Sequence, residues 1–182
     1  MIGIARVALL GAALHLAPGV AAVTPPPQPD PLDADVSFLP TPRAVVDGMF
    51  DLARVHAGDV LYDLGAGDGR IPIEAAQRFG IRAVGIEINP RMVEVARANV
   101  KRAGVEQLVE IRQGDALEAD FRDATVVTLF LFRELNLKLR PRLRAQLRPG
   151  ARIVSHRFDM GDWAPDAQVT VHGNPLYLWT IR

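Results

Sequence analysis

The sequence contains no cysteine among its 182 residues. Disulfide bonds, thiolate nucleophiles, zinc–sulfur sites and iron–sulfur clusters are therefore excluded. Only four histidines are present, and no two lie at helical ligand spacing, so we expect no metal site. Neither sign of charge is in excess, because 21 basic side chains balance 21 acidic ones. Proteins that cover nucleic acid carry a marked basic excess, and we therefore expect no nucleic-acid partner.

Apolar residues are plentiful: they make up 49% of the chain, enough for the core of one domain. The N-terminus has a different character. Residues 7–23 form an uncharged apolar run after Arg6, which is typical of a secretory signal peptide and slightly short for a membrane-spanning helix. We expect residues 1–23 to be a cleaved signal or a retained membrane anchor. The localisation is then export or attachment to the cytoplasmic membrane, on a side that the sequence does not fix.

The rest of the chain divides into two parts. Residues 24–37 are rich in proline and predict an extended linker, and residues 38–182 predict the folded domain. In that domain short apolar runs alternate with amphipathic ones, the pattern of a parallel sheet with helices on its faces. The pattern predicts helices at 42–54, 72–79, 90–103 and 137–147, and strands at 60–64, 83–86, 108–112, 125–130, 152–155, 168–171 and 176–181.

The last two predicted strands are joined by Gly173-Asn174-Pro175. This connection is too short for a helical crossover, so the two strands must pair antiparallel as a hairpin.

A glycine-rich loop, DLGAGDG at residues 63–69, follows the first predicted strand. Glycines at this point let the backbone turn sharply and let a ligand lie directly against the main chain. Glu87 ends the second strand, and Asp115 and Ala116 follow the third. All of them fall at the carboxyl edge of a parallel sheet, where Glu87 would accept hydrogen bonds from the ribose of a nucleoside. Asp115 would accept from the amine of an adenine, and the Ala116 N–H would donate to its ring.

The loop favours a cationic nucleoside over a dinucleotide. The dinucleotide fingerprint G-x-G-x-x-G requires a third glycine where this chain has Arg70. Asp63, at the strand end, suits a cationic ligand tail rather than a pyrophosphate, which binds to bare N–H groups. S-adenosylmethionine carries an ammonium and a sulfonium and fits these electrostatics. The alternatives are a nicotinamide-dependent oxidoreductase and a catalytically silent nucleoside-binding module.

Three segments, residues 60–70, 84–89 and 114–116, resemble the nucleoside-binding motifs of class I S-adenosylmethionine-dependent methyltransferases. The resemblance implies an α/β fold: a Rossmann-like, doubly wound seven-stranded sheet of order 3-2-1-4-5-7-6 with strand 7 antiparallel. The chain departs from the family pattern because it lacks a helix between strands five and six. The cofactor-binding residues that the chemistry and the resemblance suggest are Thr41, Asp63, Gly65, Ala66, Gly67, Gly69, Glu87, Ile88, Asp115 and Ala116.

Further segments are similar to the small protein-lysine methyltransferases of archaea and mitochondria: residues 38–42, residues 128–132 with Asn136, and residues 155–160. The mitochondrial members modify the ATP synthase c subunit and the adenine nucleotide translocase. The similarity implies a lysine side chain of a protein as methyl acceptor, and membrane association through residues 7–23. A small-molecule acceptor is the alternative.

A lysine acceptor must lose a proton before it attacks, and an aromatic pocket favours this because desolvation lowers the amine pKa. Phe38, Phe130 and Phe132 are candidate walls of such a pocket, or else they belong to the core. Asn136 is a candidate to orient the amine through its carbonyl oxygen, and Glu134 is a further acid near the site.

Other roles are open for residues near the site. Asn136 caps the helix predicted from residue 137, if it does not bind the amine. Thr41 either contacts the carboxylate of the cofactor or only caps the first helix. His156 and Asp159 follow the fifth strand and are candidates for a base and the group that orients it.

Overall fold

The structure, a computed structural model, describes residues 39–182. The predicted signal or anchor, the proline-rich linker and Phe38 lie outside these residues. The described elements are α1 (Arg43–Ala53), β1 (Val60–Leu64), α2 (Arg70–Phe79), β2 (Arg82–Glu87), α3 (Pro90–Ala103), β3 (Val109–Gln113), β4 (Val126–Leu129), α4 (Arg133–Gln146), β5 (Arg152–His156), β6 (Ala167–Val171) and β7 (Asn174–Thr180).

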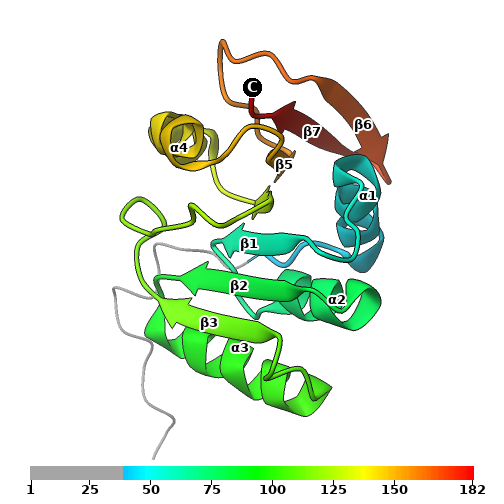
Figure 1. The fold of residues 1–182 in the computed structure, drawn as a ribbon, viewed down its shortest axis with the longest axis vertical. Helices are drawn as coiled ribbons and strands as arrows, with labels where there is room; N and C mark the ends of the chain where they lie inside the picture. The colour runs from blue at the N-terminus through cyan, green and yellow to red at the C-terminus, as the bar shows by residue number, and fades with distance from the viewer. Residues whose placement is uncertain (1–38) are drawn as a thin grey trace, which may run out of the picture. The chain divides into compact units, whose positions relative to one another are not determined.

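All strands join one 7-stranded sheet of order β3-β2-β1-β4-β5-β7-β6, which confirms the expected topology. Strands β1 to β5 are parallel, and the arrowheads of β1, β2 and β3 point the same way in Figure 1. Strand β7 runs antiparallel to both β5 and β6, so the predicted hairpin is also confirmed. The carboxyl ends of β1 to β5 therefore meet at one edge of the sheet, called here the carboxyl edge.

The helices cover the two faces of the sheet unequally. Helices α1, α2 and α3 bury Met49, Ala75 and Val93 in one core cluster, together with side chains from one face of the sheet. Helix α4 buries Leu139 and Leu143 in a second cluster on the opposite face. In the described chain no helix occurs in the connection 114–125 or in 157–166, which confirms the absence expected between β5 and β6. The segments around the carboxyl edge are therefore mostly loops.

Three helix starts differ from prediction. Helix α2 begins at Arg70 rather than at Pro72. Helix α4 begins at Arg133 rather than at Leu137, so Asn136 lies inside the helix, fully buried, and its predicted alternative as a cap is wrong. Its amide turns inward to other side chains instead of toward the backbone of the next turn. Helix α1 has Pro42 at its N-cap and no side-chain cap, because the hydroxyl of Thr41 contacts His156 instead.

Within residues 39–182, no helix combines the length and the apolar character needed to cross a membrane. The same part of the chain contains no group of three or more His, Asp or Glu side chains placed to bind a metal ion.

Candidate functional site

The glycine loop leaves the end of β1 in a conformation that side chains rarely adopt. Gly65, Gly67 and Gly69 have φ values of 85°, 53° and 80°. A Cβ added at Gly65 would lie 2.6 Å from Cδ2 of Leu131. The loop is also tied to β2, since the Gly65 and Ala66 N–H groups both donate to the carbonyl of Ile86 at 2.9 Å. Bare backbone is thus held in a fixed shape at the carboxyl edge, as the glycines predict.

Glu87 fastens this loop to the end of β2. Its side chain is buried; Oε2 accepts from the Gly67 N–H at 2.8 Å and Oε1 from the Asn89 N–H at 2.9 Å. Each carboxylate oxygen accepts one of these bonds and retains a further lone pair for a ribose hydroxyl. The neighbouring Ile88 is 56% exposed and offers an apolar surface beside that carboxylate. This arrangement suits a nucleoside whose sugar lies over the end of β2.

Asp63 is buried at the end of β1, where the Oγ1 of Thr128 on β4 donates to it at 2.7 Å. The pKa of Asp63 is raised to about 7, mainly by burial; the Thr128 bond opposes this increase, and the nearby charges of Glu87 and Asp68 add to it. The nearby cation Arg70 is already bound by Asp68, at 2.6 Å. No basic side chain within residues 39–182 pairs with Asp63, so a ligand cation would fit against this carboxyl group.

Asp115 lies just beyond the end of β3 and is exposed. Its Oδ1 accepts from the Leu117 N–H at 2.8 Å and stabilises the turn there. The half-buried Ala116 packs against the core that α4 covers. The other oxygen of Asp115 has no such bond, and the predicted contacts of Asp115 and Ala116 with adenine stay predictions.

Thr41 and His156 form a buried polar contact that sequence reasoning missed. The amide nitrogen of Asn174 donates to backbone carbonyls of its own turn, so its Oδ1, 3.2 Å from His156 Nε2, accepts the Nε2 proton. Nδ1 of His156 is then the acceptor for the Thr41 hydroxyl at 3.3 Å. The Thr41 proton is therefore directed at His156, and its predicted contact with a cofactor carboxylate stays a prediction.

His156 and Asp159, the candidate base and orienting group, do not pair with each other. Asp159 accepts from Nε of Arg133 at 2.9 Å and from the Gly161 N–H at 2.9 Å, and these bonds turn it toward α4. The Gly161 bond is the main cause of the lowered pKa of Asp159. Burial lowers the pKa of His156, with Asn174 opposing and Arg157 adding to the effect. His156 is thus a neutral side chain held by Thr41 and Asn174.

An aromatic cluster stands at the ends of β4 and β5. The ring of Phe130 lies 4.0 Å from that of His156 and 6.4 Å from that of Phe158, and Phe158 lies 5.7 Å from Phe132. Phe132 is 64% exposed. Phe130 and Phe132 were predicted as pocket walls, whereas Phe158 was not; its place just after β5 was the available signal. We call Phe130, Phe132 and Phe158 the aromatic cluster.

Asn136 connects α4 to this cluster. Its Nδ2 donates to Oγ of Ser155 at 3.1 Å and to the carbonyl of Phe158 at 3.2 Å, and Ser155 also donates to that carbonyl, at 2.6 Å. Oδ1 of Asn136 is buried and has no hydrogen-bond partner. An unpaired buried acceptor is unfavourable, so it is suited to receive a donor from a ligand. The predicted acid Glu134 is exposed in the first turn of α4.

Comparison with protein families gives one clear match. The model of the ANTKMT methyltransferase domain matches residues 63–167. A protein-lysine N-methyltransferase of Saccharolobus islandicus (strain REY15A) is 43% identical over 151 residues, which cover 80% of this chain and 94% of the relative. The adenine nucleotide translocase lysine N-methyltransferase of Mus musculus is 37% identical over 140 residues, which cover 76% of this chain and 60% of the relative.

Among solved structures, the chain is similar to an RNA methyltransferase from Salinibacter ruber in complex with S-adenosyl-L-homocysteine. The sequence identity is 59% and the TM-score 0.77, with 79% of this chain and 94% of that chain covered.

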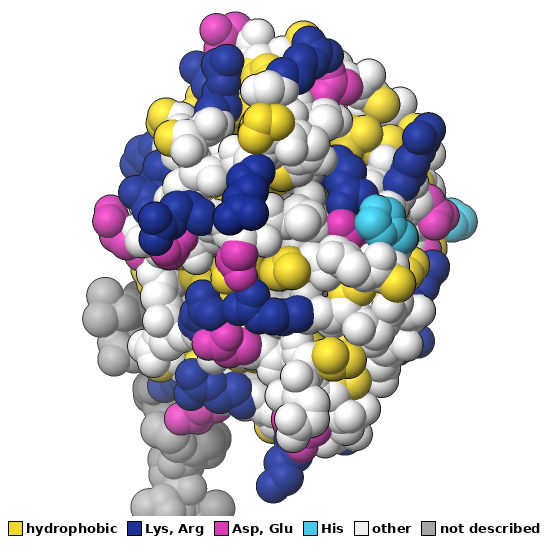
Figure 2. All heavy atoms as spheres, viewed as in Figure 1, with side chains coloured by type: hydrophobic (Ala, Val, Ile, Leu, Met, Phe, Trp, Pro, Cys, Tyr) yellow, Lys and Arg dark blue, Asp and Glu magenta, His cyan; other side chains and the backbone are white. Residues whose placement is uncertain are grey.

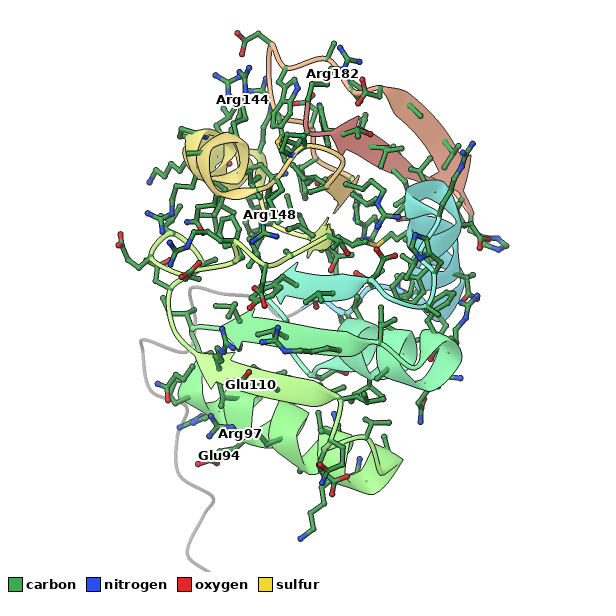
Figure 3. The ribbon with its side chains drawn as sticks, viewed as in Figure 1. Glu94, Arg97, Glu110, Arg144, Arg148 and Arg182 are labelled. Atoms are coloured by element: carbon green, nitrogen blue, oxygen red, sulfur yellow. The ribbon has the colours of Figure 1, made fainter. Side chains whose placement is uncertain are left out.

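The role of Glu87 predicts the effect of Glu87→Gln. An amide offers one acceptor atom instead of two and no charge, so we expect S-adenosylhomocysteine to bind about tenfold more weakly, the loss of one charged hydrogen bond. Isothermal titration calorimetry measures this. Glu94→Gln, on the exposed side of α3 (Figure 3), is the matched control and should leave the affinity unchanged. If the wild type and both variants bind S-adenosylhomocysteine with equal affinity, Glu87 does not contact the ribose.

The pKa of Asp63 predicts a pH dependence. A carboxyl group with a folded pKa of about 7 holds a proton that the unfolded chain has lost above pH 4, so this group lowers the free energy of unfolding as pH rises from 4 to 7. Because an ammonium ligand needs the ionised form, S-adenosylhomocysteine should bind up to about tenfold more weakly at pH 6 than at pH 8. Binding near pH 6.5 should release a proton, seen as a calorimetric enthalpy that varies with the buffer.

The Asp63→Asn variant should bind S-adenosylhomocysteine weakly at both pH 6 and pH 8, and its binding should release no proton. A variant that keeps the wild-type pH profile would show that another group is responsible.

Proposed function

The chain belongs to the ANTKMT methyltransferase family, and from this premise we propose that it transfers a methyl group from S-adenosylmethionine to a lysine amine of a protein. The observation that carries the proposal is the meeting of two sets of side chains at the carboxyl edge. Glu87 and Asp63 end β2 and β1, and the aromatic cluster with Asn136 lies at the ends of β4 and β5. The relatives from Saccharolobus islandicus and Mus musculus are both lysine N-methyltransferases.

The first set of side chains fits the cofactor. Glu87 is placed to bind the ribose, and Asp63 is placed to bind the α-ammonium. The glycine loop lets the amino-acid tail of the cofactor lie against the main chain. Bound S-adenosylmethionine would supply a methyl group activated by a positive sulfur. The protein therefore has to align the acceptor with that methyl group and to exclude water.

The second set fits an amine. A lysine arrives as an ammonium, and an aromatic surround lowers its pKa by desolvation, so that a proton leaves to solvent. Oδ1 of Asn136 can accept a remaining N–H and so direct the nitrogen lone pair. The new N–CH3 bond then forms as the S–CH3 bond breaks, and S-adenosylhomocysteine leaves. The faces of Phe132 and Phe158 can hold the resulting alkylammonium by cation–π contact.

RNA is a second candidate acceptor, because the Salinibacter ruber protein of 59% identity is described as an RNA methyltransferase. The charge of this chain favours a protein substrate. Its formal net charge is +0, and Figure 2 shows acidic side chains interspersed with the Lys and Arg of the visible face. An RNA-binding surface would require a continuous basic field.

The direct test is methyl transfer from radiolabelled S-adenosylmethionine to membrane and soluble fractions of the source cell. We expect the label on a protein, and mass spectrometry should place it on a lysine side chain. Residues 7–23 favour an acceptor at a membrane, and this location is part of the proposal. A label that resists protease and is released by ribonuclease would instead establish RNA as the acceptor.

Asn136→Ala tests the amine contact. We expect kcat to fall at least about tenfold, because the positioned acceptor is lost, while the affinity for S-adenosylhomocysteine changes less than twofold. Ser155→Ala is the matched control: it removes a bond from the same network but retains Oδ1. If Ser155→Ala lowers kcat as much as Asn136→Ala does, Asn136 acts only by supporting the loop.

A further inference from the structure

Arg157 has an unusual backbone conformation directly after β5. Its φ is 69°, in the left-handed region that glycine adopts easily and other residues rarely do. Two hydrogen bonds fix it: the Arg157 N–H donates to the carbonyl of Pro175 at 2.8 Å, and the Phe158 N–H to the carbonyl of His156 at 2.9 Å. The side chain of Arg157 is thus presented from a rigid turn between two residues of the site.

The other non-glycine residues with positive φ in the described chain have ordinary turn roles. Arg54 caps the C-terminus of α1, and His172 lies in the turn between β6 and β7. Arg157 instead separates His156, which contacts Phe130, from Phe158. Strain of this kind concentrates where a side chain is needed in a defined place.

The guanidinium of Arg157 is also available. It is exposed, and within residues 39–182 it has no hydrogen bond, ion pair or ring partner. Its neighbour at the carboxyl edge, Arg133, is bound to Asp159 at 2.9 Å. Arg54 and Arg148 are likewise unpaired in that part of the chain, but they precede β1 and β5 and so lie at the opposite edge.

Opposite charges flank the aromatic cluster. Arg157 adjoins Phe158 in the chain, and Glu134, exposed and without an ion pair in the described residues, lies in the first turn of α4, two residues after Phe132. The rings of Phe132 and Phe158 are 5.7 Å apart. The two segments that carry these rings therefore also carry an exposed acid and an exposed base.

We propose that Arg157 is a specificity-determining residue that binds a carboxylate close to the target lysine in the sequence of the substrate. This inference rests on the proposed function. A guanidinium pairs with a carboxylate through two parallel hydrogen bonds, and a rigid backbone reduces the entropy lost in forming them. Glu134 attracts the lysine ammonium on the other side and repels the phosphates of RNA, so the pair of charges favours a peptide containing both lysine and an acidic residue.

The test uses the full-length protein and synthetic peptides with a single lysine. In one set a glutamate occupies successive positions on either side of the lysine, and in the matched set glutamine replaces it. We expect kcat/KM to be about fivefold to tenfold higher with glutamate at the best position, mainly through KM, and the preference to shrink as salt is added. Arg157→Gln should abolish the preference, and Arg157→Lys should retain part of it.

Two further variants separate charge from folding. Arg148→Gln removes an unpaired arginine that precedes β5, at the opposite edge, and should keep the full preference. Arg157→Gly relieves the backbone strain, so the unfolding midpoint should rise by about 2–4 °C while the preference disappears. If Arg157 had only a structural role, the Arg157→Gly variant would keep the preference for glutamate peptides.

The outcomes that overturn the inference are distinct from each other. Equal methylation of glutamate and glutamine peptides would refute the role of Arg157 and leave the proposed function standing. Weaker binding of S-adenosylhomocysteine to Arg157→Gln would assign Arg157 to the cofactor. Methylation of RNA and of no lysine peptide would refute the proposed function together with the inference.

Discussion

The chemistry of the carboxyl edge depends on one buried carboxyl group, that of Asp63, which has no basic partner within residues 39–182. Its pKa is raised to about 7 because burial removes the water that would stabilise its charge. The charges of Glu87 and Asp68 add to this effect, and Asp68 is itself paired with Arg70. An edge with this balance of charge disfavours a pyrophosphate and favours a cation. The same physical constraint therefore selects a sulfonium nucleoside over the dinucleotides that other doubly wound sheets bind.

The uneven helical cover determines how an acceptor reaches that edge. Helices α1 to α3 pack against one face and α4 against the other, and no helix is described in the connections 114–125 and 157–166. With little structure above the ends of β4 and β5, the aromatic cluster is partly open, and Phe132 is exposed. An open edge of this kind suits a large acceptor such as a folded protein, since a small molecule is better held by an enclosed pocket.

Several features that do not favour stability occur together at the end of β5. Oδ1 of Asn136 is buried without a partner, Arg157 has a left-handed backbone, and Phe132 presents an aromatic ring to solvent. Each is unfavourable by itself. Their concentration beside the aromatic cluster is the signature of a site that binds a ligand.

The sequence by itself determined the sheet and placed the residues predicted to bind the nucleoside at one edge of it. Alternating apolar runs, the short link before β7 and the glycines around Gly67 are local signals, and parallel strands bring their ends together without further information. The acceptor half was decided only by the tertiary structure. Asn136 turns into the core because α4 starts at Arg133, and Phe158 joins Phe130 because the chain folds back after β5.

His156 shows the same limit of sequence reasoning. Sequence proximity suggested Asp159 as its partner, but the fold supplies Thr41 and Asn174 from distant segments. Backbone periodicity fixes where a strand ends, whereas the direction of a polar side chain depends on which donors and acceptors the rest of the chain brings within hydrogen-bonding distance.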